Sequence, residues 1–365
     1  MRPKIACTRK KPSCGTALDA DADQLDSDPH IVIAGAGSIG CFVGGLLAAA
    51  GRNVTLLVRP RVAAEIRAHG LTLTDLDGMA VQVRADAIGL SEDPACMEDA
   101  DVVLVTVKSR STDALGREIA QYAPRHAPVV SLQNGVTNAE VLRQRLPARD
   151  VRAGMVAFNV VPMGQGCYHR AVEGDIVVEA GPGDLVAVMQ APGLECVESR
   201  DIESVQWGKF LMNLNNALNA LSGLPLQEQL KNRGWRRLMA DQWAEAHSVL
   251  KACGIKPKSF TPVPVGALPW VLRLPNAIFL RLASAMLKID PQARTSMSYD
   301  LMEGRPTEID ALQGMVVRKG TETGVPTPIN AMVMDVMKTA ELAKEGLPNL
   351  TLESLRAELS QNGRS

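Results

Sequence analysis

A glycine-rich turn between an apolar run and a helix-forming run constrains this chain more than any other feature. Residues 30–34 read HIVIA, which is the length of a short strand, and Gly35-Ala36-Gly37-Ser38-Ile39-Gly40 follows at once. The next residues, FVGGLLAAAG, favour a helix. In this context GxGxxG predicts a dinucleotide-binding unit, with Gly35 at the tight turn, Gly37 beside a pyrophosphate and Gly40 under the packed helix. A strand–turn–helix without a ligand is the alternative.

The residue after the second apolar run indicates which dinucleotide the unit prefers. Val54–Val58 reads as a strand, and Arg59 follows it. NAD-binding sites usually place an acidic residue there for the ribose 2′-hydroxyl, whereas a guanidinium attracts a 2′-phosphate. Arg59, with Arg61 close by, therefore predicts NADPH (NADP) as the cofactor. A surface or helix-capping arginine is the alternative.

Two further apolar runs predict central parallel strands. Asp101–Val107 is followed by Lys108, and Val129–Leu132 is followed by Gln133-Asn134-Gly135. Ligands of open α/β sheets bind at the carboxyl ends of the strands, so Lys108 and Asn134 are candidate site residues. Both could instead serve the turns themselves, since Asn-Gly is a strong turn signal. Runs at 153–161 and 176–180 are expected to extend the sheet, and Asp77-Gly78 to turn a hairpin.

The second half of the chain carries a helix with an unusual polar face. Residues 205–223, VQWGKFLMNLNNALNALSG, read as one helix that Ser222-Gly223 ends. Asn213 and Asn216 fall on the same face as Lys209. Asparagine is a mediocre helix former, so an ammonium beside two carboxamides indicates a face that serves a site. A packing cluster of asparagines beside a surface lysine is the alternative.

Strand patterns stop after about residue 200, and helix-like segments follow at 235–253, 276–288, 307–323 and 328–345. The predicted fold class is therefore α/β: an N-terminal Rossmann-type dinucleotide-binding domain at 30–200, then an all-helical C-terminal domain at 201–350. The substrate cleft is expected between the two domains. Residues 1–29 lack the apolar centre of a secretory signal and are expected to form a disordered tail.

Composition argues against several classes of partner. The net charge is −1 and aromatic residues make up only 3%, which disfavours nucleic acid or a membrane surface. The seven cysteines lie far apart without a CxxC, and the histidines show no ligand spacing, so no metal is predicted and a reducing cytoplasm fits best. No apolar run approaches the roughly 18 residues of a membrane span. A small-molecule substrate is expected, and a homodimer is left open.

The motifs together resemble the ketopantoate reductase family, the NADPH-dependent 2-dehydropantoate 2-reductases of pantothenate synthesis. The resemblance covers residues 30–340 and rests on six matches: GAGSIG, VKS at 107–109, QNG at 133–135, WGKFLMN at 207–213, TSM at 295–297 and GRPTEID at 304–310. It implies reduction of the 2-keto group of ketopantoate to (R)-pantoate.

The resemblance also implies roles for the matching residues. The pyrophosphate would lie on the turn formed by Gly35, Ala36, Gly37, Ser38, Ile39 and Gly40. The remaining residues that would contact cofactor are Arg59, Lys108, Asn134 and Glu308. Lys209 would donate the proton, with Glu308 orienting it. Substrate would be held by Asn134, Asn213 and Ser296. From the residues alone, Glu308 could instead be a first-turn acid of a helix that Thr307 caps.

One departure from the family pattern bears on the substrate. Many members have a second helix asparagine eight residues after the lysine, where this chain has Ala217. Asn215 and Asn216 are nearest, and Asn216 is predicted to take the role because it shares the Lys209 face. Another family asparagine has no counterpart near Leu226. The alternatives are a reductase of another 2-oxo acid, a hydroxyacyl-CoA or glycerol-3-phosphate type dehydrogenase, and a non-catalytic NADPH-sensing module.

Overall fold

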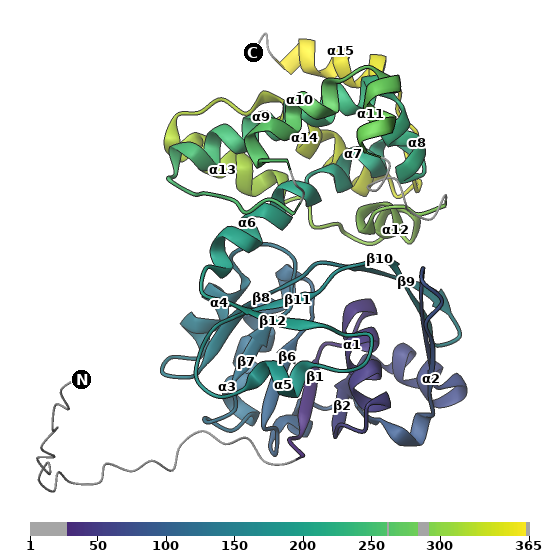
Figure 1. The fold of residues 1–365 in the computed structure, drawn as a ribbon, viewed down its shortest axis with the longest axis vertical. Helices are drawn as coiled ribbons and strands as arrows, with labels where there is room; N and C mark the ends of the chain where they lie inside the picture. The colour runs from purple at the N-terminus through teal and green to yellow at the C-terminus, as the bar shows by residue number, and fades with distance from the viewer. Residues whose placement is uncertain (1–27, 261–262, 284–291, 363–365) are drawn as a thin grey trace, which may run out of the picture.

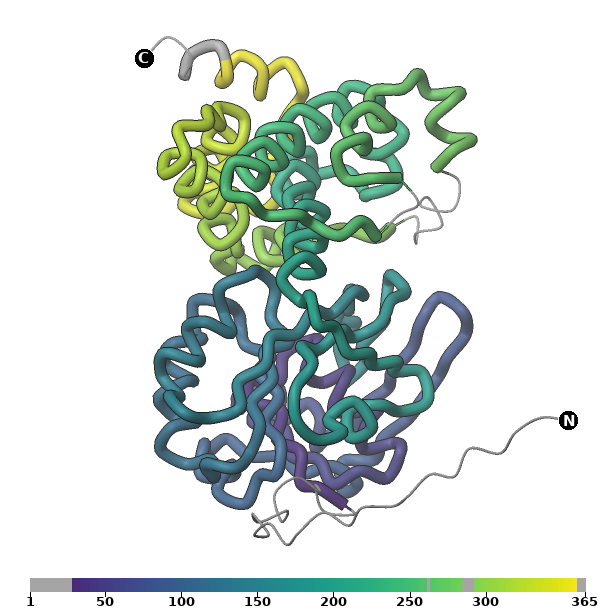
Figure 2. Tube along the Cα trace, turned by 60° about the vertical axis from the view of Figure 1, so that its left-hand side comes forward, coloured from purple at the N-terminus to yellow at the C-terminus, as the bar shows by residue number. Residues whose placement is uncertain are grey.

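The computed structural model describes residues 28–260, 263–283 and 292–362. Within these ranges a body built on β-sheets lies next to a helical body, and helix α6 runs between them (Figures 1 and 2). This arrangement confirms the predicted fold class. The predicted tail at 1–29 lies almost entirely outside the described residues, and so does the end of the helix predicted at 276–288.

The larger sheet has eight strands in the order β12-β11-β8-β7-β6-β1-β2-β5. All neighbours are parallel except β8 and β11, which run antiparallel. The strands are β1 (Ile31–Ala34), β2 (Val54–Leu57), β5 (Gly89–Ser91), β6 (Val102–Val105), β7 (Val129–Ser131), β8 (Val151–Val156), β11 (Ile176–Glu179) and β12 (Cys196–Ser199). The predicted parallel strands are confirmed.

Strand β1 shows why the parallel strands of the large sheet are apolar at every position and do not alternate apolar with polar residues. Ile31 and Ile33 pack in one core beside helix α1 (Ser38–Ala49), whereas Val32 and Ala34 pack in another beside helix α3 (Thr112–Tyr122). Both faces of the strand are therefore buried, as in sheets that are covered by helices on each side. The other helices of this body are α2 (Pro60–His69), α4 (Asn138–Arg145) and α5 (Leu185–Met189), with short 3₁₀ turns at 85–87, 94–97 and 109–111.

A second sheet has the order β4-β3-β10-β9, and α1 lies between the two sheets. Its strands are β3 (Leu71–Asp75), β4 (Ala80–Val83), β9 (Asn159–Gly164) and β10 (Cys167–Val172). The hairpin at Asp77-Gly78 is confirmed, since β3 and β4 pair antiparallel and Gly78 has φ +93°. The expectation that 153–161 extends the large sheet is confirmed for 153–156, which belong to β8, and is wrong for 159–161, which belong to β9 of the second sheet. The expected extension at 176–180 is confirmed by β11. The chain changes sheet after Val156, because Phe158 turns to pack against Phe42 of α1 with ring centroids 5.7 Å apart.

The helical body contains ten helices within the described residues. They are α6 (Ile202–Asn213), α7 (Asn215–Ser222), α8 (Leu226–Lys231), α9 (Arg233–Ala252), α10 (Leu268–Arg273), α11 (Asn276–Leu282), α12 (Ser296–Met302), α13 (Gln313–Thr323), α14 (Pro328–Ala343) and α15 (Leu352–Asn362), with a 3₁₀ turn at 265–267. The helix over 205–223 is predicted as one element, and this is wrong at Leu214, where α6 ends and α7 begins. The Gln313 side chain donates to the Leu214 carbonyl at 2.8 Å, which occupies a carbonyl near the break in the helix.

Two further helix expectations need correction. The segment 307–323 becomes helical only at Gln313, so Glu308 lies in a preceding turn and is not a first-turn acid of a helix that Thr307 caps. The segment 294–298 has no evident period, yet Ser296 begins helix α12 with Thr295 as its N-cap residue. Both corrections concern segments that approach the β-sheet body, where tertiary contacts decide the local conformation.

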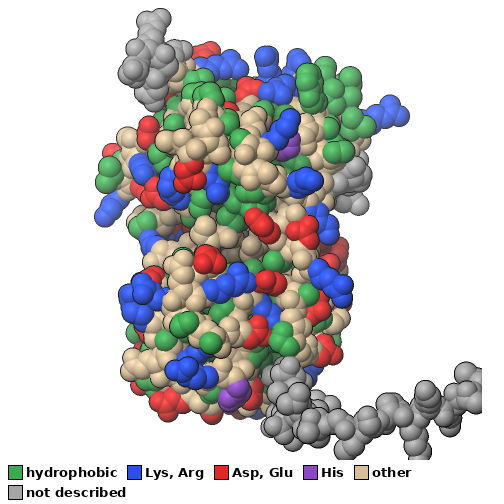
Figure 3. Space-filling model, turned by 90° about the vertical axis from the view of Figure 1, so that its left-hand side faces the viewer, with side chains coloured by type: hydrophobic (Ala, Val, Ile, Leu, Met, Phe, Trp, Pro, Cys, Tyr) green, Lys and Arg blue, Asp and Glu red, His purple; other side chains and the backbone are tan. Residues whose placement is uncertain are grey.

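The surface of the molecule mixes charges of both signs. Figure 3 shows lysine and arginine side chains interspersed with aspartate and glutamate over one face. None of the helices within the described ranges has the length and apolarity to cross a membrane. No group of three or more potential metal ligands occurs among those same residues.

Candidate active site

A cavity of about 1080 Å³ lies between the two bodies. The β-sheet body contributes the turn before α1, the residues after β6 and β7, and the chain between β8 and β9. The helical body contributes α6, α7 and α12 together with the turn that holds Glu308. The cavity therefore occupies the carboxyl end of the parallel strands, where ligands of open α/β sheets bind.

The glycine turn presents backbone to this cavity. Gly35 has φ +84°, and a Cβ there would lie 2.0 Å from Val107 Cγ1. At Gly40 a Cβ would lie 2.5 Å from Thr106 Oγ1, which explains how α1 packs so closely on the sheet. A Cβ at Gly37 would meet nothing within 4 Å, and Gly37 lines the cavity. The turn is thus tight on its protein side and open on the side that a ligand would approach.

The first turn of α1 has no side-chain cap, and Ser38 and Ile39 line the cavity with Gly37. Helix N-termini carry N–H groups without intrahelical partners, together with the positive end of the helix dipole. An anion such as a pyrophosphate would therefore be stabilised at this point. Gly35, Ala36 and Gly40 support the turn from behind and do not line the cavity.

Arg59 lies away from the other predicted cofactor residues. It is exposed, occupies the N-cap position of α2, and does not line the cavity. Only Val58 separates Arg59 from the end of β2. Arg59 therefore lies at the carboxyl edge of the sheet, where the ribose of a dinucleotide binds in this fold. Its neighbour Arg61 pairs with Glu65 at 3.4 Å on the surface. The 2′-phosphate role of Arg59 stays a prediction.

Lys108 connects the two bodies through a residue that sequence reasoning missed. Its ammonium donates to the carboxylate of Asp300 on α12, whose side chain is only 3% exposed. Arg305 also pairs with Asp300, with Nε 3.3 Å from Oδ1. The partners Lys108 and Asp300 are 192 residues apart in the chain, and no local pattern marks such a pair.

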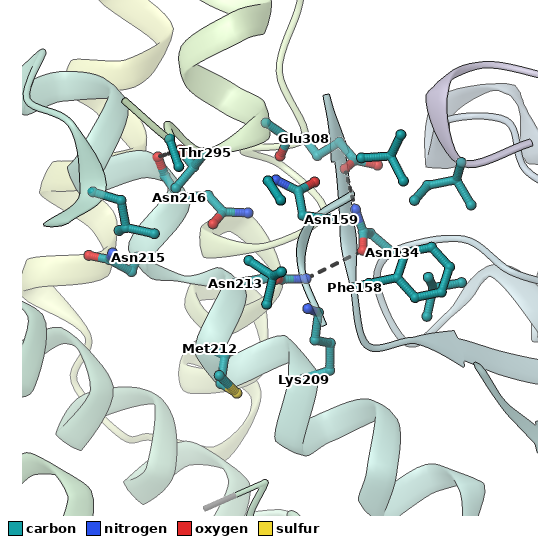
Figure 4. A pocket seen from close by; sticks show the side chains of 18 of the residues that line it. Asn134, Phe158, Asn159, Lys209, Met212, Asn213, Asn215, Asn216, Thr295 and Glu308 are labelled. Carbon is teal, nitrogen blue, oxygen red and sulfur yellow. Dashed lines mark hydrogen bonds between the residues drawn. The ribbon is translucent and has the colours of Figure 1, made fainter. Parts of the chain in front are cut away.

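Asn134 stands at the centre of a second connection between the bodies. Its Nδ2 donates to Glu308 Oε2 at 3.3 Å, and its Oδ1 accepts from Asn213 Nδ2 at 3.5 Å. Its backbone carbonyl accepts from Asn138 and Ser109, which fixes the turn after β7. Figure 4 shows the Asn134 side chain between those of Asn213 and Glu308. Three predicted site residues are therefore brought into one chain of hydrogen bonds.

Lys209 lies one helical turn before Asn213 on α6. Its Nζ donates to the Ala157 carbonyl at 3.1 Å, at the place where the chain leaves the large sheet. Burial lowers the pKa of Lys209 from 10.5 to about 8. Gly208 permits close approach of the chain at Lys258, since a Cβ at 208 would lie 2.0 Å from the Lys258 carbonyl oxygen. Lys209 is therefore a half-buried side chain with one hydrogen-bond partner among the described residues, on a helix face against which the chain at Lys258 packs closely.

Glu308 accepts a hydrogen bond from Asn134, and none joins it to Lys209 among the described residues. Its predicted part in helping to orient Lys209 stays a prediction. Burial raises the pKa of Glu308, and this effect outweighs the opposing influence of the Lys108 ammonium and of the Asn134 hydrogen bond. A carboxyl with a raised pKa and a lysine with a lowered pKa that line the same cavity are typical of a functional site.

The two neighbouring asparagines of α7 point in different directions. Asn215 is buried and exchanges two hydrogen bonds of 3.2 Å with Gln229. Both asparagines line the cavity, but Asn216 is half-buried, and Figure 4 shows it on the side of Asn213 while Asn215 turns away. Ser296, at the start of α12, also lines the cavity. Geometry therefore favours Asn216 over Asn215 as a residue that a ligand can reach.

Further cavity residues escaped the sequence analysis. Phe158 and Asn159 enter the site because the chain changes sheet there, and Thr295 enters through the start of α12. Arg294 lines the cavity and donates to the Gly223 carbonyl at the end of α7. For Arg294 and Thr295 the signal in the sequence was the TSM motif at 295–297, which does not tell which side chains face a cavity.

Two family models match the two halves of the chain. The model described as Ketopantoate reductase PanE/ApbA matches residues 31–183, and the model described as Ketopantoate reductase PanE/ApbA C terminal matches residues 201–341. The chain belongs to the ketopantoate reductase family. The matches include the glycine turn in the first half and both Lys209 and Glu308 in the second.

Individual members of the ketopantoate reductase family resemble the chain over most of its length. The 2-dehydropantoate 2-reductase of Halobacterium salinarum is 26% identical over 321 residues, which is 86% of this chain and 99% of that protein. The enzyme of the same name from Mesorhizobium japonicum is 28% identical, over 85% of this chain and 97% of its own. The crystal structure of a PanE/ApbA family ketopantoate reductase from Ralstonia eutropha JMP134 has a TM-score of 0.73 and 31% identity, covering 87% of this chain and 99% of that one.

Proposed function

We propose that this chain reduces the 2-keto group of ketopantoate (2-dehydropantoate) to (R)-pantoate with NADPH, as an oxidoreductase of pantothenate biosynthesis. The observation that carries the proposal is the position of Lys209, a half-buried lysine with a pKa of about 8, in the same cavity as the open glycine turn. A non-catalytic NADPH-sensing module has no need of such an ammonium. A hydroxyacyl-CoA type dehydrogenase relies on a catalytic histidine, and no described histidine lines the cavity.

The residues present fit NADPH. The backbone at Gly37, Ser38 and Ile39 would bind the pyrophosphate, because Gly37 has no side chain in the way and the first turn of α1 faces the cavity. Arg59 would bind the 2′-phosphate, and Lys108 and Asn134 would line the nicotinamide end. When bound, NADPH supplies the hydride that is transferred to C2 of the substrate.

Lys209 would supply the proton. Negative charge develops on the C2 oxygen during reduction, and a positioned ammonium both stabilises this charge and protonates the oxygen. With a pKa of about 8, Lys209 is mostly protonated at neutral pH yet more acidic than an ordinary lysine. Glu308 would act through Asn134, which it fixes by a hydrogen bond, and would stand beside the cofactor.

The substrate would be held by neutral side chains. Asn134, Asn213, Asn216 and Ser296 line the same cavity as Lys209 and provide amide and hydroxyl groups. Such groups can bind a carboxylate and a hydroxyl and so fix the ketone in one orientation. Holding the reacting groups in place accounts for a large share of catalysis in a two-substrate reaction.

We also propose a homodimer in the cytoplasm. Trp270 on α10 and Leu282 on α11 are 73% and 64% exposed, and exposed apolar side chains of this size are common at interfaces. The described cysteines are free, which fits a reducing compartment. Light scattering on the purified protein tests the dimer, and a monomer at micromolar concentration would contradict it.

Oxidation of NADPH with ketopantoate, followed by absorbance, tests the function. We expect turnover with NADPH to exceed turnover with NADH, and we expect pantoate as the product by chiral chromatography. Protein that binds NADPH but oxidises it with no 2-oxo acid would support the sensing module instead.

A further inference from the structure

Two polar side chains meet behind the cavity, at the starts of neighbouring helices. Thr112 is the first residue of α3, and Asn138 is the first residue of α4. The Thr112 hydroxyl donates to Asn138 Oδ1 at 2.9 Å. The two residues are only 1% and 4% exposed, and neither is among the described residues that line the cavity. Any influence that they have on a ligand must therefore pass through other residues.

Gln133 supplies the first part of a hydrogen-bond network around this pair. Its Nε2 donates to the Thr112 hydroxyl at 2.7 Å and to the Val107 carbonyl at 2.9 Å. Its Oε1 accepts from the Ser131 hydroxyl at 3.0 Å. A side-chain amide has two N–H hydrogens to donate, and both are used here. Because Val107 directly precedes Lys108, Gln133 fixes the backbone on one side of Lys108.

Asn138 supplies the second part of the network. Its Nδ2 donates to Ser109 Oγ at 3.1 Å and to the Asn134 carbonyl at 2.6 Å, so both of its N–H hydrogens are also used. Ser109 Oγ donates in turn to the same Asn134 carbonyl at 3.1 Å. Asn138 therefore fixes the backbone on the other side of Lys108 and the carbonyl of Asn134 at the same time.

Thr112 joins the two parts. Its hydroxyl accepts from Gln133 and donates to Asn138, which uses its one hydrogen. A buried network whose donors all have acceptors holds its members in one arrangement, and the loss of one member leaves its partners unpaired. Removing this hydroxyl should therefore loosen the turn at 107–109 and the turn at 133–135 together.

The two turns carry residues that contact the helical body. Lys108 donates to Asp300, and Asn134 donates to Glu308 Oε2 at 3.3 Å. Burial raises the pKa of Glu308, and the backbone N–H of Ser109 acts against this increase. Lys108 and Asn134 are also the residues proposed for the nicotinamide end of the cofactor. Their separation therefore decides where a nicotinamide ring can lie.

We propose that Thr112 and Asn138 are positioning residues for the nicotinamide end of the cofactor site. They act through the turns at 107–109 and 133–135, and so hold Lys108 and Asn134 at a fixed separation. This inference rests on the proposed function, because it uses the same cofactor and the same two contact residues. The pyrophosphate end of the site, on the turn before α1, does not depend on this network.

Two variants of Thr112 test the proposal. Thr112→Val replaces the hydroxyl by a methyl group of similar size, whereas Thr112→Ser keeps the hydroxyl. Titration calorimetry gives the Kd of NADPH and of 2′-phospho-ADP-ribose, which lacks the nicotinamide. In Thr112→Val the Kd of NADPH should rise by about fivefold or more, the effect of losing one ordinary hydrogen bond, and that of 2′-phospho-ADP-ribose should not change. Thr112→Ser should keep both values.

Turnover gives a second readout. In Thr112→Val we expect kcat with ketopantoate to fall by about tenfold or more, since a displacement of about 1 Å at the reacting groups can cost roughly a hundredfold. Thr112→Ser should restore most of this loss. If Thr112→Val does not fold, as judged by the loss of a cooperative melting transition, Ser109→Ala makes the same test by removing one donor to the Asn134 carbonyl.

A buried hydroxyl of the helical body provides the matched control. Ser222, at the end of α7, is 6% exposed and donates to the Asn219 carbonyl at 2.8 Å. Ser222→Ala should lower the melting temperature, because it also removes a buried hydrogen bond. It should leave the ratio of the two Kd values unchanged, since it touches neither turn.

The outcomes are distinguishable. Equal losses of affinity for NADPH and for 2′-phospho-ADP-ribose in Thr112→Val would overturn the proposal, because a general loosening of the fold does not single out the nicotinamide. Unchanged affinity for both ligands would overturn it too, and so would equal losses in Thr112→Ser. If the unchanged protein bound NADPH but reduced no ketopantoate, the proposed function would fail, and the ratio of the two Kd values would still decide the positioning role.

Discussion

The two ends of the cavity are built in different ways. At the glycine turn the chain presents backbone, and side chains such as Val107 and Thr106 press against the turn from behind. At the reaction end Lys209 and Asn134 are side chains, and their positions depend on the Ala157 carbonyl and on Glu308 from distant segments. The glycine turn is therefore specified by a few consecutive residues. The end that holds Lys209 and Asn134 forms only when the β-sheet body and the helical body have folded and packed together.

The largest effect is expected at Lys209. Lys209→Ala should lower kcat by about 10²–10⁴, the usual loss when a general acid is removed. Affinity for NADPH should stay close to that of the unchanged protein, since the turn that binds pyrophosphate lies at the other end. Stopped-flow or steady-state assays give kcat, and fluorescence titration gives the Kd. Near-normal turnover by a folded variant would refute the assignment.

A smaller effect is expected from reversing the charge after β2. Arg59→Asp should weaken NADPH binding by about 1.5–3 kcal/mol, the range for a hydrogen bond to a charged group, and should weaken NADH binding much less. The ratio of the two Kd values is the measurement. Arg67→Asp is the matched control, because Arg67 lies in the last turn of the same helix α2, pairs with Glu92 on the surface and does not line the cavity. Equal losses for both cofactors in Arg59→Asp would exclude the 2′-phosphate role.

Two substitutions within the glycine turn should separate binding from stability. Gly37→Ala adds a Cβ into open space, so the melting temperature should change little while the KM for NADPH rises. Gly40→Ala places a Cβ 2.5 Å from Thr106 Oγ1, so it should destabilise the fold by about 1–3 kcal/mol, as overpacking does. Both variants are compared by thermal melting and by NADPH titration. If Gly37→Ala lowered the melting temperature and left the KM for NADPH unchanged, Gly37 would not face the cofactor.

The smallest effect on turnover is expected at the junction of α6 and α7. Gln313→Ala removes the donor to the Leu214 carbonyl and should lower the free energy of unfolding by about 1–3 kcal/mol, the cost of leaving a buried carbonyl unpaired. Urea unfolding measures this loss. Turnover should fall only slightly, since Lys209 and Asn213 both precede the break. A fall in kcat as large as that of Lys209→Ala would show that the junction itself positions the site.

The same contrast explains what could be predicted from the sequence. The strands, the glycine turn and the change from sheets to helices followed from local patterns, and so did the shared face of Lys209 and Asn213 on α6. The pairing of Lys108 with Asp300, the entry of Asn159 and the bond from Glu308 to Asn134 depend on contacts between segments far apart in the chain. The α6–α7 break depends on Gln313, a residue 99 positions away. No periodicity or propensity encodes such contacts.

The pH dependence of kcat/KM for ketopantoate tests the central claim most directly, because it reports ionisations in the free enzyme. The lysine must be protonated to act, so activity should fall as pH rises through about 8, the pKa of Lys209. The residual activity of Lys209→Ala should lack this alkaline fall. An alkaline fall with the same midpoint in both proteins would show that another group donates the proton.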